Sequence, residues 1–134
     1  MVEMRLRSIK INDTGDRQYV NLAEVGGNRR LPIVIGYQEA QAIDRFVKEK
    51  TFQRPLTHDL LVAMVEATGS KVERVDITEL RDGTYYAMIR LARLDGSASE
   101  IDARPSDAIA LATAAKAPIF VAEAVLEESA EIEA

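Results

Sequence analysis

The order of elements along this chain predicts an α+β fold of two layers, in which a mixed sheet carries its helices on one face. Two observations favour this fold class. Strand-like alternation and helix-like apolar spacing occupy separate blocks, and the second half of the chain repeats the block order of the first. The length of 134 residues fits one domain, which we expect at residues 1–130, followed by an acidic tail at 131–134.

The first half predicts three strands and two helices. The strands are expected at residues 5–12, 17–25 and 30–35, separated by turn-forming clusters at 12–15 and 26–28. Helical spacing follows at residues 39–48, and a second helix at 58–68 begins after the break at Pro55. For this second helix Thr57 is the expected N-cap and Gly69 the stop. Its expected apolar face consists of Leu60, Leu61, Met64 and Val65.

The second half predicts the same plan. Strands are expected at residues 72–80, 84–94 and 97–103, a helix at 106–115, a short extended piece at 119–121 and a last helix at 123–129. The tail beyond Ala130 is expected to fray. Aligning residues 33–40 with 101–108 superimposes a strand end, a turn, an acidic residue and the first helical alanine. We therefore predict a duplicated β-β-β-α-α unit.

Two loops with an Asp-Gly pair suggest the strand register. A three-residue loop with glycine in the left-handed position would pair Val75 with Ile89, whereas a two-residue turn would pair it with Arg90. We prefer the first alternative because it keeps apolar residues together on the core face. Ser99 and Ile101 of the third strand should join that face, although their stagger stays open.

The opposite face of this sheet is predicted to be largely polar. Asp76 and Asp102 flank Met88 there, about 10 Å apart, which is too far to share one metal ion. Tyr86 and Met88 lie in the middle of this face. We expect them to form a subunit interface, so that the protein is a homo-oligomer.

Composition excludes several classes of protein. The chain has no cysteine, which excludes disulfides, a thiolate nucleophile and a cysteine-ligated zinc. The net charge of −5 comes from five glutamates in residues 123–134, and the other 17 acidic residues balance the 17 basic ones. Such a body lacks the excess of basic residues of a tight non-specific DNA binder. Without a secretory signal or an apolar run of ~20 residues, we expect a cytoplasmic protein that does not enter membranes.

Two segments, residues 54–61 and 101–112, carry a resemblance to a known family. Supporting segments lie at residues 31–36, 82–87 and 117–121. In this order and spacing the chain resembles the bifunctional nuclease domain family from about residue 1 to residue 129. The resemblance implies a small oligomeric α/β domain that cleaves both DNA and RNA. It supplies no catalytic residues, so the candidates below rest on chemistry.

His58 and Asp59 open the second predicted helix. His58 is the only histidine and is a candidate general base or metal ligand, with Asp59 as a second ligand or base. A single histidine rules out the two-histidine acid–base pair of metal-free ribonucleases. The alternative is that both are ordinary first-turn residues, with Asp59 complementing the helix dipole.

Arg104, Ser106 and Asp107 close a strand and open a helix. Free backbone N–H groups, the Arg104 guanidinium and the Ser106 hydroxyl could bind a phosphate, and Asp107 could hold a metal ion. A first-turn carboxylate repels phosphate unless a cation intervenes, so we expect either metal plus phosphate or neither. The alternative is that Pro105 and Asp107 are ordinary helix-start residues.

Two further candidates come from the first repeat. Glu39 is the counterpart of Asp107 and would be a ligand of a second, pseudo-symmetric metal site. Arg54 belongs to a small basic cluster with Lys48 and Lys50, which could contact nucleic acid or be merely solvated.

The leading hypothesis is a nuclease that depends on Mg²⁺ or Mn²⁺ and hydrolyses single-stranded or loosely structured DNA and RNA. His58 or Asp59 would act as base or ligand, Asp107 as metal ligand and catalytic residue, and Arg104 as phosphate clamp. A non-enzymatic, oligomeric regulatory module is the alternative from another class, and a small-anion sensor at residues 104–107 is a third.

Overall fold

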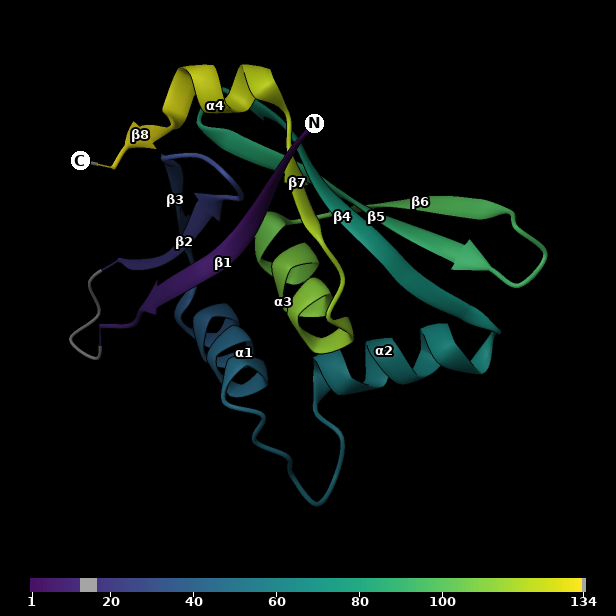
Figure 1. Cartoon of the computed structure of the whole chain (residues 1–134). Coiled ribbons are helices and arrows are strands. Elements are labelled where there is room, and N and C mark those ends of the chain that lie inside the picture. Colours follow the sequence, from purple (N-terminus) through teal and green to yellow (C-terminus); the bar gives the residue numbers. More distant parts are fainter. Residues whose placement is uncertain (13–16, 134) are drawn as a thin grey trace.

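One eight-stranded sheet runs through the molecule, in the order β6-β5-β4-β7-β1-β2-β3-β8 (Figure 1). This computed structural model describes residues 1–12 and 17–133, so the turn predicted at 12–15 lies mostly outside the described residues. In Figure 1 α1 and α2 lie at the bottom, α3 lies above them between β1 and β4, and α4 lies at the top. The predicted α+β class with a mixed sheet is confirmed.

The observed elements follow the predicted duplication. The first half forms an antiparallel meander and two helices, and the second half forms another meander, two helices and two short strands. The bounds in the first half are β1 Val2–Lys10, β2 Gln18–Glu24, β3 Arg29–Ile35, α1 Tyr37–Val47 and α2 Thr57–Ala67. Those in the second are β4 Ser70–Arg81, β5 Thr84–Arg93, β6 Ala98–Ala103, α3 Pro105–Ala115, β7 Ile119–Val121, α4 Glu123–Ser129 and β8 Glu131–Ile132.

The short strand β7 joins the two meanders. It runs parallel to β4, with Ile119 opposite Val75, and antiparallel to β1, with Ile119 opposite Met4. Ile119 and Val121 are buried. The extended piece predicted at 119–121 is therefore a central strand, and its burial on both flanks explains its uninterrupted apolar sequence.

The β4–β5 hairpin has the predicted register but not the predicted turn. Val75 pairs with Ile89, and Ile77 pairs with Ala87. However, Arg81 pairs with Thr84, so the turn holds only two residues, Asp82 and Gly83, both with positive φ. Positive φ at both positions is typical of a type I′ hairpin turn. An irregularity between Ile77 and Glu79 then shifts the pairing by one residue, which restores the apolar register.

The β5–β6 hairpin has the predicted three-residue loop. The Arg93 N–H donates to the Ser97 carbonyl at 2.9 Å, and Gly96 has a φ of +86°. Ile89 pairs with Ile101, which fixes the stagger that the sequence left open. Met88 lies between Asp76 and Asp102, as predicted.

The predicted face of α2 is wrong except at Val65. Leu60, Leu61 and Met64 are exposed by 52%, 39% and 59%, whereas Val62 and Val65 pack against the core. Apolar residues surround this helix on all sides, so the spacing alone does not define its buried face. The N-cap is Leu56 rather than Thr57, and the Asp59 carboxylate accepts the Leu56 N–H at 2.9 Å. Gly69 follows the helix with positive φ, as predicted.

Helix α3 lies at the centre of the helical layer. It contacts α1 and α2 on its flanks and β4 and β5 above. Small residues allow this close approach: Ala108, Ala110 and Ala112 are buried together with Ile109 and Leu111. Its first turn is consequently held between the other two helices.

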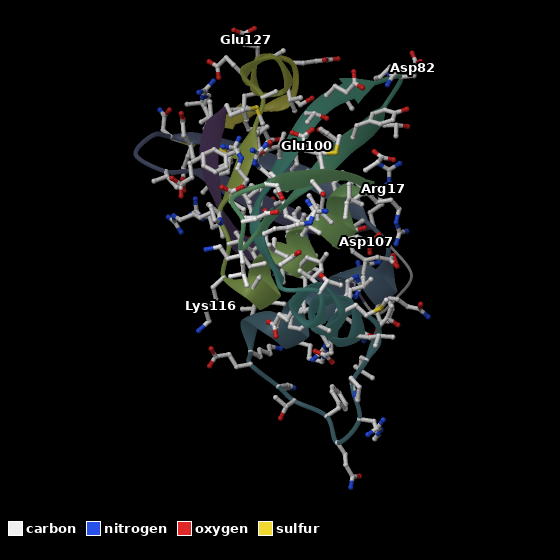
Figure 2. All side chains as sticks on the ribbon, turned by 90° about the vertical axis from the view of Figure 1, so that its right-hand side faces the viewer. Arg17, Asp82, Glu100, Asp107, Lys116 and Glu127 are labelled. Carbon is white, nitrogen blue, oxygen red and sulfur yellow. The ribbon has the colours of Figure 1, made fainter. Side chains whose placement is uncertain are left out.

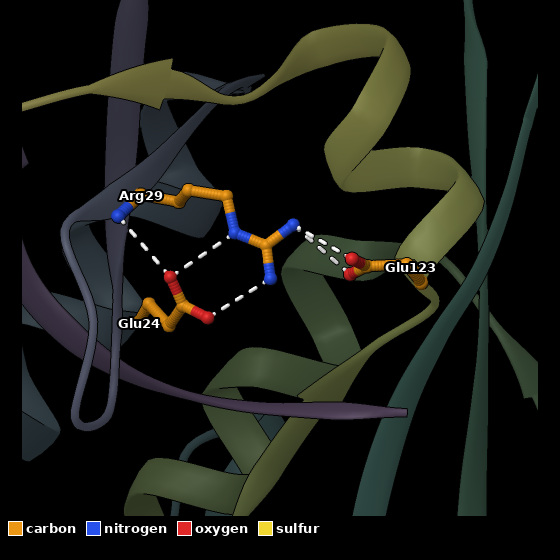
Figure 3. Close-up of polar contacts among 3 residues, drawn as sticks. All are labelled: Glu24, Arg29 and Glu123. Carbon is orange, nitrogen blue, oxygen red and sulfur yellow. Dashed lines mark hydrogen bonds and ion pairs between the residues drawn. The ribbon is translucent and has the colours of Figure 1, made fainter.

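Residues 131–133 are held in place, which contradicts the fraying predicted beyond Ala130 for these three positions. Residues 131–132 pair with β3, the Glu133 N–H donates to the Asn28 carbonyl at 2.8 Å, and Glu133 forms an ion pair with Arg7. Nearby, Arg29 bridges Glu24 of β2 and Glu123 of α4, at 2.9 Å and 3.0 Å (Figure 3). These contacts join the end of the second repeat to the first.

Candidate active site

A cavity of about 940 Å³ opens between the three packed helices and the end of the sheet. Its walls come from the first half of α1, the α1–α2 connection, the start of α2, strands β5 and β6, and the start of α3. Four of its lining residues, Glu39, His58, Arg104 and Asp107, come from the starts of the three helices and are called the charged end here. The apolar lining residues Leu61, Val65, Ile89, Leu91 and Leu111 are called the apolar end. Such a cavity, mostly apolar with a few convergent polar groups, is typical of small-molecule sites.

His58 and Asp107 meet at the charged end. His58 Nε2 lies 2.9 Å from Asp107 Oδ1, although the two residues come from the first turns of different helices. In Figure 2 Asp107 lies at one side of the molecule and Lys116, at the other end of α3, lies at the opposite side. The His58 side chain is only 13% exposed and that of Asp107 is 28% exposed. The pair is thus partly shielded from water but open to the cavity.

Arg104 holds the second oxygen of the same carboxylate. Its Nε donates to Asp107 Oδ2 at 2.9 Å, and its side chain is 66% exposed. Burial raises the pKa of the Asp107 carboxyl, but the hydrogen bonds from Arg104 and His58 outweigh burial and hold that pKa below its ordinary value. Asp107 is therefore a carboxylate at neutral pH.

This charge state fixes the tautomer of His58. A carboxylate only accepts hydrogen bonds, so Nε2 of the imidazole must carry the proton that lies between them. In neutral His58 the lone pair is then on Nδ1, which makes no hydrogen bond within the described part of the chain. The arrangement can therefore accept a proton at Nδ1 while Asp107 stabilises the imidazolium that results.

Glu39 belongs to the same end of the cavity. It occupies the third position of α1, as Asp59 does in α2 and Asp107 in α3. Its carboxylate folds back over Gly36, where a Cβ atom would collide with it. Asp107, by hydrogen bond and charge, and then the more distant charge of Glu39 raise the pKa of Arg104. The predicted counterpart of Asp107 thus shares its cavity rather than forming a second site.

Asp59 points away from His58 to a residue that sequence analysis did not single out. Arg45 Nη2 lies 3.1 Å from Asp59 Oδ2, and Arg45 Nη1 donates to the Lys50 carbonyl at 3.2 Å. The guanidinium lies 4.2 Å from the Phe46 ring centroid and its side chain is 9% exposed. Arg45 is a charged residue near the end of α1, so the helical spacing of apolar residues gave no signal of its burial.

The predicted metal ligands do not form one ligand set. No group of three or more His, Asp or Glu residues within residues 1–12 and 17–133 is arranged to hold a metal ion. Asp59 is bound by Arg45 and the Leu56 N–H, and Asp107 is bound by Arg104 and His58. These side chains therefore do not fit a resident ion with several protein ligands.

Two predicted phosphate-binding residues lie apart from this cavity. Ser106 is buried, with 7% exposure, and does not line it. Arg54 is exposed on the α1–α2 connection and does not line it either. Of the predicted basic residues, Arg104 and Lys50 face the cavity.

Comparison with known proteins decides the family. The bifunctional nuclease domain matches residues 20–133. The chain belongs to the bifunctional nuclease domain family. An uncharacterised protein of Mycobacterium tuberculosis is 37% identical to it over 129 residues, which cover 96% of this chain and 76% of that protein. The resemblance noted in the sequence is thereby confirmed.

Two plant relatives carry the family's name. Bifunctional nuclease 1 of Oryza sativa subsp. japonica is 28% identical over 123 residues, covering 90% of this chain and 37% of the rice protein. Bifunctional nuclease 1 of Arabidopsis thaliana is 32% identical over 101 residues, covering 73% of this chain and 31% of its own length. This domain thus corresponds to about a third of each plant protein. Within the described residues, no helix has the length and apolar character needed to cross a bilayer.

Proposed function

We propose that this bifunctional nuclease domain hydrolyses phosphodiester bonds in single-stranded or loosely structured DNA and RNA. One observation carries the proposal: His58, Asp107 and Arg104 form a hydrogen-bonded chain at the charged end of an open cavity. The family and the plant nucleases named in it support the reaction class.

In this mechanism His58 is the general base. Its Nδ1 takes a proton from a water molecule as that water attacks the phosphorus, and Asp107 stabilises the imidazolium through Nε2–H. The P–O bond to the leaving nucleoside oxygen breaks, and that oxygen takes up a proton from solvent water. Positioned bases of this kind contribute roughly 10²–10⁴-fold to a rate.

Arg104 is the phosphate clamp. Only its Nε is engaged by Asp107, so the outer guanidinium nitrogens remain to bind phosphate oxygens and the charge that develops in the transition state. The Asp107 carboxylate keeps the guanidinium at the mouth of the cavity. Asp59 is assigned a positioning role, because it joins the start of α2 to Arg45 and does not itself line the cavity.

No step of this mechanism passes through a metal ion. Mg²⁺ is commonly bound by one or two carboxylates together with substrate phosphates, so Mg²⁺ or Mn²⁺ would arrive with the nucleic acid. Asp107 and Glu39, which line the same cavity, are the carboxylates that we propose for such an ion. Comparing EDTA with added metal measures this contribution directly.

The test is cleavage of labelled single-stranded RNA and DNA by repeatedly purified protein, in EDTA, Mg²⁺ or Mn²⁺. We expect Asp107→Asn to lose roughly 10²-fold or more in rate. Asp82→Asn is the matched control, because Asp82 lies in the β4–β5 turn, far from Asp107 in Figure 2. Equal cleavage by the two variants would remove Asp107 from the mechanism. The absence of cleavage under every condition would overturn the proposal.

A further inference from the structure

The apolar end of the cavity exceeds what the His58–Asp107 pair requires. Leu61 and Val65 of α2, Ile89 and Leu91 of β5, and Leu111 of α3 form its walls. At its rim Phe52 is 58% exposed and Ile101 is 46% exposed. A general base and a phosphate clamp need no such surface. We therefore expect an apolar part of the ligand to contact these walls.

The charges at the other end bind phosphate only weakly by themselves. Lys50 has no carboxylate within ion-pair distance in the described residues, and Arg104 has free outer nitrogens. Glu39 and Asp107 bring carboxylates to the charged end, and Asp107 already accepts a hydrogen bond from Arg104. Because carboxylates line the cavity beside these cations, attraction to a phosphate is partly offset, and much of the binding energy must come from the apolar walls.

We propose that the apolar end is a subsite for one unpaired nucleobase, whose attached phosphate lies at Arg104. This inference rests on the proposed nuclease function and names the part of the substrate that the cavity binds. The volume of about 940 Å³ lies within the range of small-ligand sites and accommodates a nucleotide. An exposed aromatic ring such as that of Phe52 offers a stacking face, which every base can use.

The chemistry of the walls sets the substrate class. Aliphatic side chains contact the faces of a base but read neither the hydrogen-bond pattern of its edge nor a 2′-hydroxyl. Binding of this kind tolerates any sequence and accepts both DNA and RNA. A base can reach the walls only when it is not stacked within a duplex. Single strands can therefore bind directly, whereas a duplex must first unpair and unstack the base, which weakens its binding.

Mononucleotides provide a test that does not depend on cleavage, because they contain no phosphodiester bond. Adenosine 5′-monophosphate has a base and a phosphate, ribose 5-phosphate lacks the base, and inorganic phosphate lacks both base and sugar. His58 is the only histidine and lines the cavity, so its ring-proton NMR signals report binding there without overlap from another histidine. Titration of the intact protein with each compound gives three affinities.

We expect the adenosine nucleotide to bind roughly tenfold or more tightly than ribose 5-phosphate, because stacking on a protein surface is worth ~1–3 kcal/mol per base. Leu61→Gln should remove most of that difference and leave the affinity for ribose 5-phosphate unchanged. Leu60→Gln is the matched control: Leu60 lies on the same helix, is 52% exposed and does not line the cavity.

Equal affinities for the nucleotide and ribose 5-phosphate would overturn the subsite and leave a phosphate site only. Loss of nucleotide binding in both leucine variants would also overturn it, and a change of oligomeric state in both would identify a second copy of the chain as the occupant. Base-dependent binding without cleavage would uphold the subsite while the nuclease proposal fails. Cleavage without base-dependent binding would uphold the nuclease proposal and overturn the subsite.

Discussion

His58 Nε2 and Asp107 Oδ1 lie 2.9 Å apart, although 49 positions separate the two residues in the chain. His58 comes from the first repeat and Asp107 from the second, so the contact exists only where the two repeats pack together. Each residue occupies the first turn of its helix, where orphan N–H groups favour negative charge. The structure therefore places the Asp107 carboxylate and the His58 imidazole together at the starts of two helices.

Replacing His58 tests the general base. His58→Gln keeps a polar side chain of similar reach but cannot take up a proton near neutral pH. We expect the cleavage rate to fall roughly 10²–10⁴-fold with little change in substrate binding. Steady-state kinetics on a single-stranded oligonucleotide measure the two effects separately. Gln53→Ala, on the exposed α1–α2 connection and outside the cavity, is the control and should retain the wild-type rate.

The depressed pKa of Asp107 predicts a pH dependence of stability. An aspartate in an unfolded chain titrates near ~3.9, and the folded value lies below this. The stabilisation is therefore fully present above about pH 4 and is lost as the pH falls through the folded pKa. The difference in unfolding free energy between the wild type and Asp107→Asn should therefore shrink as the pH falls below about pH 4. A difference that is constant from pH 7 to pH 3 would contradict the assignment.

Arg45 is expected to matter for both stability and activity. Arg45→Met removes the contacts to Asp59 and to the Lys50 carbonyl, and we expect a loss of roughly 1–3 kcal/mol in unfolding free energy. The start of α2 should loosen and move His58, so the cleavage rate should fall as well. Lys48→Met changes an exposed cation on the same helix and serves as the control in urea denaturation. Equal stability of the two variants would refute a structural role for Arg45.

The contacts in Figure 3 predict a specific role for Gly27. A Cβ atom at this position would collide with the Glu24 carboxylate, which must then leave Arg29. The hydrogen bond from Arg29 lowers the pKa of Glu24, which means that the interaction stabilises the charged form of this carboxylate. We expect Gly27→Ala to lower the thermal midpoint of the wild type but to have little further effect in a Glu24→Ala background. Additive losses in the double variant would show that the damage does not act through Glu24.

The open sheet face remains the proposed homo-oligomer interface. Tyr86 and Met88 are half-buried there, and the Arg81 guanidinium lies 4.5 Å from the centre of the Tyr86 ring. We expect Met88→Lys to shift the molar mass measured by light scattering to that of a monomer. Met64→Lys makes the same change on exposed α2 and should leave the mass unchanged. A monomer formed by Met64→Lys but not by Met88→Lys would contradict the proposal and show that the interface lies on the helices.

Local pattern predicted most of the secondary structure. Glycine and proline mark the turns, and the last helix begins and ends where the spacing indicated, at residues 123–129. The pairing of Val75 with Ile89 followed from keeping apolar residues on one face, although the turn that closes the hairpin differs. A register shift between Ile77 and Glu79 compensates for the shorter turn, and no residue in the sequence indicates this shift in advance.

The sequence by itself determined the α+β class, the duplication and the candidate residues His58, Arg104 and Asp107, because these depend on periodicity and on residue chemistry. Only the tertiary structure decided which of them meet. The arrangement of α2 beside α3 brings His58 within hydrogen-bond distance of Asp107. The arrangement of α2 beside α1 places Asp59 in an ion pair with the buried Arg45. The physical reason is that neighbours in a helical first turn point in different directions, about 100° apart, so adjacent residues serve different partners.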